Sequence, residues 1–154
     1  MSIRPPGPGI RLPTVPALVV RGRKAVWVSP EGEIEELTPS AAGARAEARQ
    51  PLVCHAPATA ARLGLKRLVG HDLLELFAFV RPAKFFLPTA RGLADAVGLP
   101  PPADLVAEAM VLRDAATLLL SVCVVYGRMA PPFSQYSTAI AAACRAALGS
   151  TDHA

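Results

Sequence analysis

Three residues of this sequence, His55, Asp72 and Asp114, have side chains that could take part in catalysis. A histidine and two carboxylates are groups that act as general acids and bases or that hold divalent cations. Each also has a structural explanation. A lone histidine at a strand end is more often a hydrogen-bonded packing residue than a ligand. Asp72 can cap a helix, and Asp114 lies about half a turn from an apolar helical stripe, as a solvated helix residue does.

The cysteines predict neither a nucleophile nor a bound cofactor. Cys54 and His55 are adjacent, and neighbouring residues of a strand point to opposite faces, which separates a thiol from an imidazole. Cys54, Cys123 and Cys144 are an odd number without short paired spacing, so we expect free buried thiols. The chain also lacks the glycine-rich lysine loop of nucleotide-hydrolysing motors and a cysteine set for an iron–sulfur cluster. We therefore predict no cofactor and no bound metal.

The elements that must position these residues follow an α/β pattern. Three short runs separated by turns at 21–24 and 29–32 predict an antiparallel meander, with strands over 17–20, 25–28 and 33–37. A fourth strand is predicted over 51–54. We expect a mixed sheet that opens with this meander and has helices packed on it.

Capping residues and glycine stops predict the helices. Thr38 before Pro39 starts a helix that runs to about Arg49, and Asp72 starts another through its capping-box spacing to Glu75. The helix after Asp72 is apolar nearly all round, which predicts burial between the sheet and another layer. The remaining helices are predicted over 58–63, from Thr89 to Val97, over about 103–125 with the stripe Leu105, Ala109, Leu112, Ala116 and Leu119, and over 137–148.

Composition bounds the organisation of the chain. It has 154 residues, 52% of them hydrophobic and 18% charged, which is enough for one domain with a sizeable core. We expect a proline- and glycine-rich arm over 1–16, one domain over 17–125, and a linker with a C-terminal helix over 126–154. The longest apolar run, 118–126, is shorter than the roughly 20 residues of a membrane span, and the N-terminus lacks a secretory signal. We expect a cytoplasmic protein without a membrane partner.

Several motifs in this order carry a family resemblance. The chain resembles the DEDD 3′–5′ exonucleases from about Ala17 to Ser121, and its stretch from His55 to Pro82 is more closely similar to the N-terminal region of alphaproteobacterial DinG-type ATP-dependent DNA helicases. The resemblance implies an RNase H-like fold, with DNA and a helicase motor as partners. The motifs are the strand end Val53-Cys-His-Ala, then Asp72-Leu-Leu-Glu-Leu, Leu93-Ala-Asp-Ala-Val-Gly-Leu-Pro, and Asp114-Ala-Ala-Thr.

Most of the acids that this family uses for cleavage are missing. Family enzymes place Asp-x-Glu on the first strand, an Asp after a His-Asn-Ala turn, and a His followed by an Asp on the last helix. Here the first strand has no carboxylate, and the acid expected after the turn falls at Thr59 or Ala60. Asp114 matches the final Asp, but Ala109 replaces the general-base His. One acid out of four cannot hold the two cations of phosphodiester cleavage, so we predict no catalytic residues and no nuclease activity. The vestigial motif positions are His55, Asp72 and Asp114.

Two basic segments are candidate contacts for nucleic acid. The chain has a net charge of +4, and residues 1–24 contain no acid; a basic edge attracts phosphates, although an ordinary solvated terminus fits as well. In the segment 81–91, cations flank Phe85 and Phe86, a combination that grips a single strand by stacking and phosphate contact. Because aromatic residues are scarce here, we favour the interpretation that both phenylalanines are core residues. The candidate contacts are Arg21, Arg23, Lys24, Arg81, Lys84 and Arg91.

The expected function is that of a catalytically inactive exonuclease-like accessory domain of a DNA helicase, or a remnant of one. It would guide single-stranded or forked DNA, or dock a helicase motor or another protein, during replication and repair. One alternative is a free-standing interaction module that dimerises through its alanine-rich C-terminal helix and does not bind nucleic acid. The other, an active metal-dependent exonuclease, needs acids that the sequence lacks.

Overall fold

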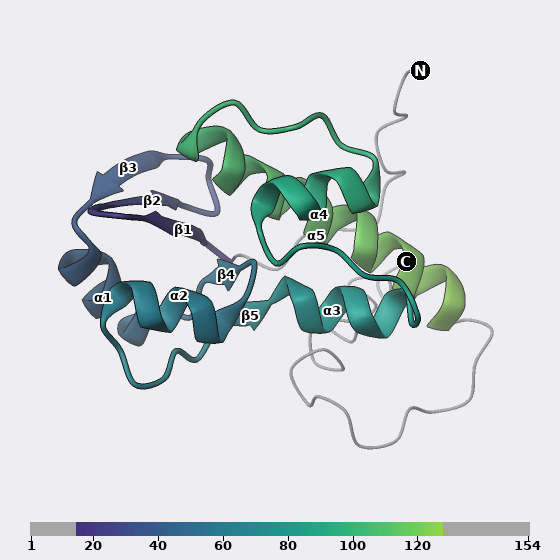
Figure 1. Cartoon of the computed structure of the whole chain (residues 1–154), viewed down its shortest axis with the longest axis horizontal. Helices are drawn as coiled ribbons and strands as arrows, with labels where there is room; N and C mark the ends of the chain where they lie inside the picture. The colour runs from purple at the N-terminus through teal and green to yellow at the C-terminus, as the bar shows by residue number, and fades with distance from the viewer. Residues whose placement is uncertain (1–14, 128–154) are drawn as a thin grey trace, which may run out of the picture.

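The structure, a computed structural model, describes residues 15–127 (Figure 1). The predicted arm is therefore seen only at its last two residues, and the predicted helix over 137–148 lies outside the described residues. The strands are β1 (Ala17–Arg21), β2 (Lys24–Val28), β3 (Ile34–Leu37), β4 (Leu52–Val53) and β5 (His71–Asp72). The helices are α1 (Pro39–Ala48), α2 (Ala56–Leu63), α3 (Leu73–Val80), α4 (Ala90–Val97) and α5 (Leu105–Gly127).

The strands form one mixed sheet. β1, β2 and β3 make the predicted antiparallel meander, in which Leu18 pairs with Trp27 and Val26 with Glu36. β4 pairs with β1 and β5 pairs with β4, both in parallel, so the order is β3-β2-β1-β4-β5 and only β2 runs antiparallel to the other strands described. The expectation of a mixed sheet that opens with a meander is confirmed. The sequence does not predict β5, because a strand of two polar residues lacks the β-branched content that marks strands.

Helices cover both faces of this sheet. In Figure 1, α1 and α2 lie on one side, and α5, with α4 packed against it, lies on the other. Neighbouring strand residues point to opposite faces, so Leu18 and Val20 of β1 pack with α1 and α2, whereas Ala17 packs with α5. A carboxylate on β1 between these positions would be buried in one of two apolar layers, at a high cost in desolvation.

The helix α5 has the predicted buried stripe. Ala109, Leu112, Ala116 and Leu119 are each at most 1% exposed, and Leu105 is half-buried. These residues pack on β1 and β2 and explain why so long and apolar a helix is stable here. Among residues 15–127, no helix is both long and apolar enough to cross a membrane.

Local signals place most of the helix ends correctly. The Thr38 hydroxyl accepts from the Ala41 N–H at 3.2 Å, the Thr89 hydroxyl accepts from the Gly92 N–H at 3.0 Å, and Gly98 ends α4 at a φ of 77°. The start of α2 differs, because the helix begins at Ala56 rather than at residue 58. Its first turn is stabilised by a carboxylate from β5, which is a contact that no local pattern predicts.

The environment of α3 also differs from the prediction. Leu73, Leu76 and Phe77 are buried, but Phe79 and Val80 are only half-buried, so one face of the helix packs rather than all of it. Figure 1 shows the reason: α3 leaves the β5 edge of the sheet and lies beside α5, beyond the strands. The helix is therefore not enclosed between the sheet and another layer.

Candidate functional site

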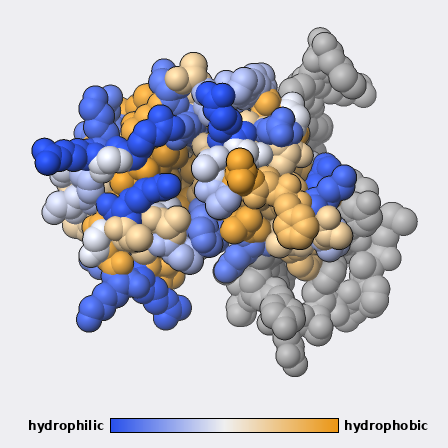
Figure 2. All heavy atoms as spheres, in the orientation of Figure 1, coloured by the Kyte–Doolittle hydropathy of each residue, from blue (hydrophilic) through white to orange (hydrophobic). Residues whose placement is uncertain are grey.

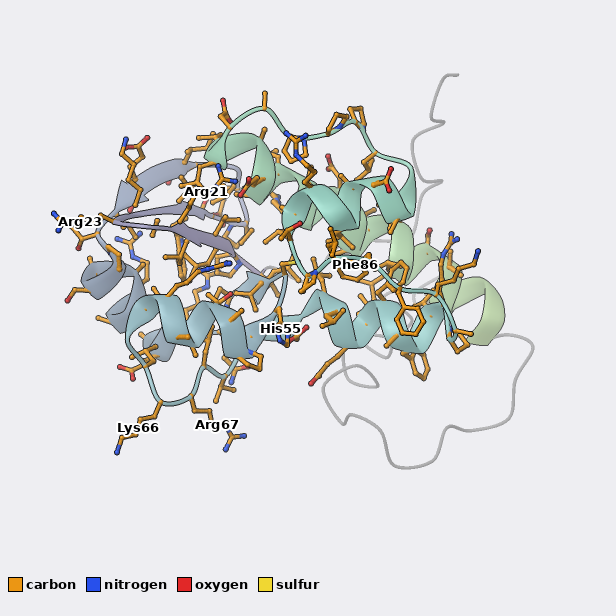
Figure 3. The ribbon with its side chains drawn as sticks, in the orientation of Figure 1. Arg21, Arg23, His55, Lys66, Arg67 and Phe86 are labelled. Carbon is orange, nitrogen blue, oxygen red and sulfur yellow. The ribbon has the colours of Figure 1, made fainter. Side chains whose placement is uncertain are left out.

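His55 and Asp72 are brought together where two parallel strands end. His55 follows β4, and Asp72 is the last residue of the neighbouring strand β5. Nδ1 of His55 lies 3.4 Å from Oδ2 of Asp72, whose side chain is only 5% exposed. Figure 3 shows His55 at the junction between α2 and α3. The carboxyl edge of parallel strands is where α/β proteins commonly bind ligands, which makes this junction the candidate site.

The Asp72 carboxylate is fully used as a helix cap. Its Oδ1 accepts from the backbone N–H groups of Leu74 at 2.8 Å and Glu75 at 3.2 Å, which confirms the predicted cap of α3. Its Oδ2 accepts from the Ala56 N–H at 2.7 Å, at the first turn of α2. One buried carboxylate thus satisfies the N-termini of two helices. A metal ion would have to compete with all three hydrogen bonds.

The His55 side chain is not the hydrogen-bonded packing residue that we expected. Its Nδ1 is buried and has no hydrogen-bond partner among the described residues. The contact with Asp72 becomes an ion pair only when the ring is protonated. The backbone carbonyl of His55, by contrast, is hydrogen-bonded: it accepts from the Thr59 hydroxyl at 2.9 Å.

The resemblance would require acids or a histidine at three positions, and the residues found there are buried in the core. Thr59 is 5% exposed and its hydroxyl is bonded to the His55 carbonyl, while Ala60 packs with α1 and the sheet. Ala109, where the resemblance would require a general-base His, is fully buried on the inner face of α5. A charged or imidazole side chain at any of these positions would displace core atoms and lose solvation.

Asp114 does not join His55 and Asp72 in a metal-binding cluster. It is exposed on α5, where neighbouring atoms still desolvate its carboxyl enough to raise its pKa, while Arg113 opposes the shift. No group of three or more His, Cys, Asp or Glu side chains within residues 15–127 could hold a metal ion. The solvated-helix interpretation of Asp114 fits this geometry.

Arg21 and Arg23, two cations of the first basic segment that the structure describes, do not form one patch. The Arg21 guanidinium pairs with the carboxylate of Glu108 at the start of α5, which neutralises much of its charge. Arg23 and Lys24 are exposed, and Figure 3 shows Arg23 extending from the hairpin away from Arg21. The sequence offers no local signal for the role of Glu108, because it is 87 residues from its partner.

The second basic segment, residues 81–91 between α3 and α4, is exposed and carries an outward aromatic ring. Phe86 packs on Phe77 with ring centroids 4.8 Å apart and planes at 76°, but Phe85 is 95% exposed. The interpretation that both phenylalanines are core residues is right for Phe86 and wrong for Phe85. Adjacent residues of an extended segment point in opposite directions, so the sequence could indicate that only one of the two rings packs, but not which one. Arg81, Lys84 and Arg91 are all exposed here.

The thiol of Cys54 is a poor nucleophile. Burial raises its pKa to about 12, and the Asp72 carboxylate adds to the shift, against a smaller opposing effect of Arg62. The thiolate is the reactive form of cysteine, so the predicted absence of a cysteine–histidine nucleophile fits this environment.

We expect Cys54 in the folded chain to react with iodoacetamide, at a pH just below the ordinary thiol pKa of 9.0, roughly a hundredfold or more slower than in the urea-unfolded chain. Because the folded pKa is raised, the thiolate appears only as the pH approaches about 12, and folding loses stability as the pH rises above 9.0. Peptide mass spectrometry would separate this residue from Cys123 and Cys144. Equal rates in the folded and unfolded chains would contradict the expectation.

Comparison with known proteins returned no relative: no family model, no curated protein and no solved structure matches this chain.

Proposed function

We propose that this chain is a catalytically inactive exonuclease-like domain that guides DNA for a DinG-type ATP-dependent helicase in replication or repair. The observation that supports the loss of catalysis is the burial of Thr59, Ala60 and Ala109, the positions where a two-metal nuclease needs acids or a histidine. Two divalent cations need several carboxylates to hold them. The chain uses these positions to pack its core.

The sheet also supports the RNase H-like fold that the resemblance implies. Its order is β3-β2-β1-β4-β5, only β2 is antiparallel to the other described strands, and helices pack on both faces. These features agree with the expected mixed sheet that opens with an antiparallel meander and has helices packed on it. Two of the three vestigial positions, His55 and Asp72, lie together at the carboxyl edge of the parallel strands, which supports the proposal, whereas Asp114 does not join them.

The test of this proposal is a cleavage and binding assay with labelled single-stranded and forked DNA. We expect the purified chain to bind these DNAs and leave them intact in both Mg²⁺ and Mn²⁺. Neither cation should raise its unfolding midpoint, because residues 15–127 contain no cluster of side chains that could hold one. An Asp114→Asn variant purified in the same way is the matched control, because Asp114 is the one acid of the family pattern that the sequence keeps, and cleavage that persists without it does not come from a site of that pattern. Metal-dependent cleavage by the parent that Asp114→Asn abolishes would overturn the inactivity, and a parent that binds neither DNA would overturn the guiding role.

The link to a helicase has a separate test. A DinG-type motor is expected to co-purify with this chain and to bind forked DNA more tightly in its presence. A motor whose affinity for forks is unchanged, and which does not co-purify, would remove the helicase from the proposal while leaving the DNA role in place.

A second candidate, a protein-interaction module, is favoured by one observation. Phe85 and Leu87 expose large apolar side chains on the same segment, and such surface often marks a protein contact. The alanine-rich helix that we expected to dimerise lies over 137–148, outside the described residues. Light scattering of the full chain tests that dimer, because a monomer at all concentrations excludes it.

A further inference from the structure

The segment 81–91 displays apolar side chains that the fold does not use. Among the large hydrophobic residues exposed within residues 15–127, Phe85 at 95% and Leu87 at 74% are the most exposed. They lie two positions apart, with the inward-facing Phe86 between them. Figure 2 shows apolar surface over this part of the molecule with hydrophilic side chains beside it. Single exposed apolar residues are common, but two on one short segment indicate a contact.

The segment is held in place, so the exposure of Phe85 is built into the structure. Phe86 anchors it edge-on against Phe77. The Lys84 N–H donates to the Arg81 carbonyl at 3.2 Å, which closes a turn in which Ala83 has a φ of 66°.

At the other end of the segment, α4 approaches the chain closely. A Cβ on Gly92 would lie 2.3 Å from the Leu87 carbonyl oxygen, so only glycine lets this part of the segment lie against the helix. A surface that is ordered before binding loses less entropy when a ligand arrives.

The charged residues of the segment 81–91 are all positive, and none of them is neutralised by an ion pair within the described part of the chain. Arg81, Lys84 and Arg91 are exposed, and none of them makes an ion pair there, in contrast to Arg21 and Arg45. The guanidinium of Arg91 approaches only the neutral carbonyl of Pro102, at 3.5 Å. No acidic residue occurs between 81 and 94 in the sequence. The segment therefore carries an exposed aromatic ring and three exposed cations that form no ion pair within the described residues.

We propose that the segment 81–91 binds single-stranded nucleic acid, with Phe85 stacking on a base and Arg81, Lys84 and Arg91 contacting phosphates. Stacking suits every base, because each has a π face, and cations on the same surface can contact the phosphates of the backbone. An apolar protein partner would use Phe85 and Leu87 but would leave the three cations without acceptors. This inference rests on the proposed function and names the surface through which it acts.

The test compares variants of Phe85 by fluorescence anisotropy with labelled oligo(dT) and oligo(rU). Phe85→Ala and Phe85→Leu are both expected to lower the affinity about tenfold, whereas Phe85→Trp retains it. Phe85→Leu is the informative variant, because leucine keeps apolar surface but has no π face. The exposure of Phe85 predicts that all three variants unfold at the parent's urea midpoint, so a loss of affinity reports binding and not folding.

The cations are tested by the salt dependence of binding. The double variant Arg81→Gln and Lys84→Gln is expected to reduce the slope of log affinity against log salt by roughly 0.7 for each phosphate that the protein no longer neutralises. Lys66→Gln with Arg67→Gln is the matched control: it removes the same charge from an exposed loop that Figure 3 places at another edge of the molecule. This control should leave the slope near that of the parent.

The possible outcomes separate a failure of the segment from a failure of the proposed function. A parent that binds while the Phe85 and Arg81/Lys84 variants bind equally well overturns the segment and leaves the proposed function standing. A parent that binds neither oligonucleotide overturns the segment as a single-strand surface, and the proposed function falls with it only if forked DNA is not bound either. Affinity retained in Phe85→Leu but lost in Phe85→Ala contradicts stacking. Binding of oligo(dT) alone assigns the surface to DNA, and equal binding of oligo(rU) assigns it to single strands of either sugar.

Discussion

Replacing Phe77 with alanine should reduce the free energy of unfolding by about 3–5 kcal/mol, the usual cost of removing a phenylalanine from a core. Phe77 is a residue of α3 and is 2% exposed. It belongs to the larger apolar cluster, in which α3 packs against α5. The change also removes the edge-to-face contact with Phe86, which is worth about 0.5–1.5 kcal/mol beyond its buried area. Urea unfolding followed by circular dichroism would measure the loss.

The matched control for Phe77 is Phe85→Ala, which removes the same atoms eight residues further along the chain. Because Phe85 is 95% exposed, its loss should change the unfolding free energy by no more than about 0.5 kcal/mol. Similar losses in the two variants would mean that the outward orientation of Phe85 is wrong, and the proposed nucleic-acid surface would fall with it.

Replacing Asp72 with alanine should destabilise the chain by about 1.5–5 kcal/mol. The loss of the α3 cap accounts for about 0.5–2 kcal/mol, and the partly buried N–H of Ala56, left without an acceptor, for about 1–3 kcal/mol more. Asp72→Asn keeps one acceptor oxygen and should lose less than Asp72→Ala. Unfolding in urea again supplies the measurement.

Two comparisons make the Asp72 result specific. Asp114→Ala removes an exposed carboxylate and should change stability by less than about 0.5 kcal/mol. The sign of the change in unfolding free energy separates a helix cap from a catalytic acid. Loss of a cap destabilises the fold, whereas catalytic carboxylates are often held at a cost in stability, so that their removal stabilises it. A stabilised Asp72→Asn variant would revive a metal-binding role for this residue.

Features that depend on neighbours close in the chain could be predicted from the residues alone. Thr38 and Thr89 cap their helices through N–H groups three residues ahead, and Gly98 ends α4 in the left-handed conformation. The stripe from Ala109 to Leu119 predicted the buried face of α5 because helical period places these residues together. The lack of carboxylates on the first strand was equally visible without the fold.

Contacts between residues that are far apart in the sequence could be learned only from the fold. The Asp72 carboxylate serves α2 as well as α3, across 16 residues, and the start of α2 thereby moves to Ala56. Arg21 pairs with Glu108, and Phe85 turns to the solvent while Phe86 packs on Phe77. The physical reason is common to these cases: each contact depends on where the sheet places elements that are distant in sequence, and local propensity contains no information on that placement.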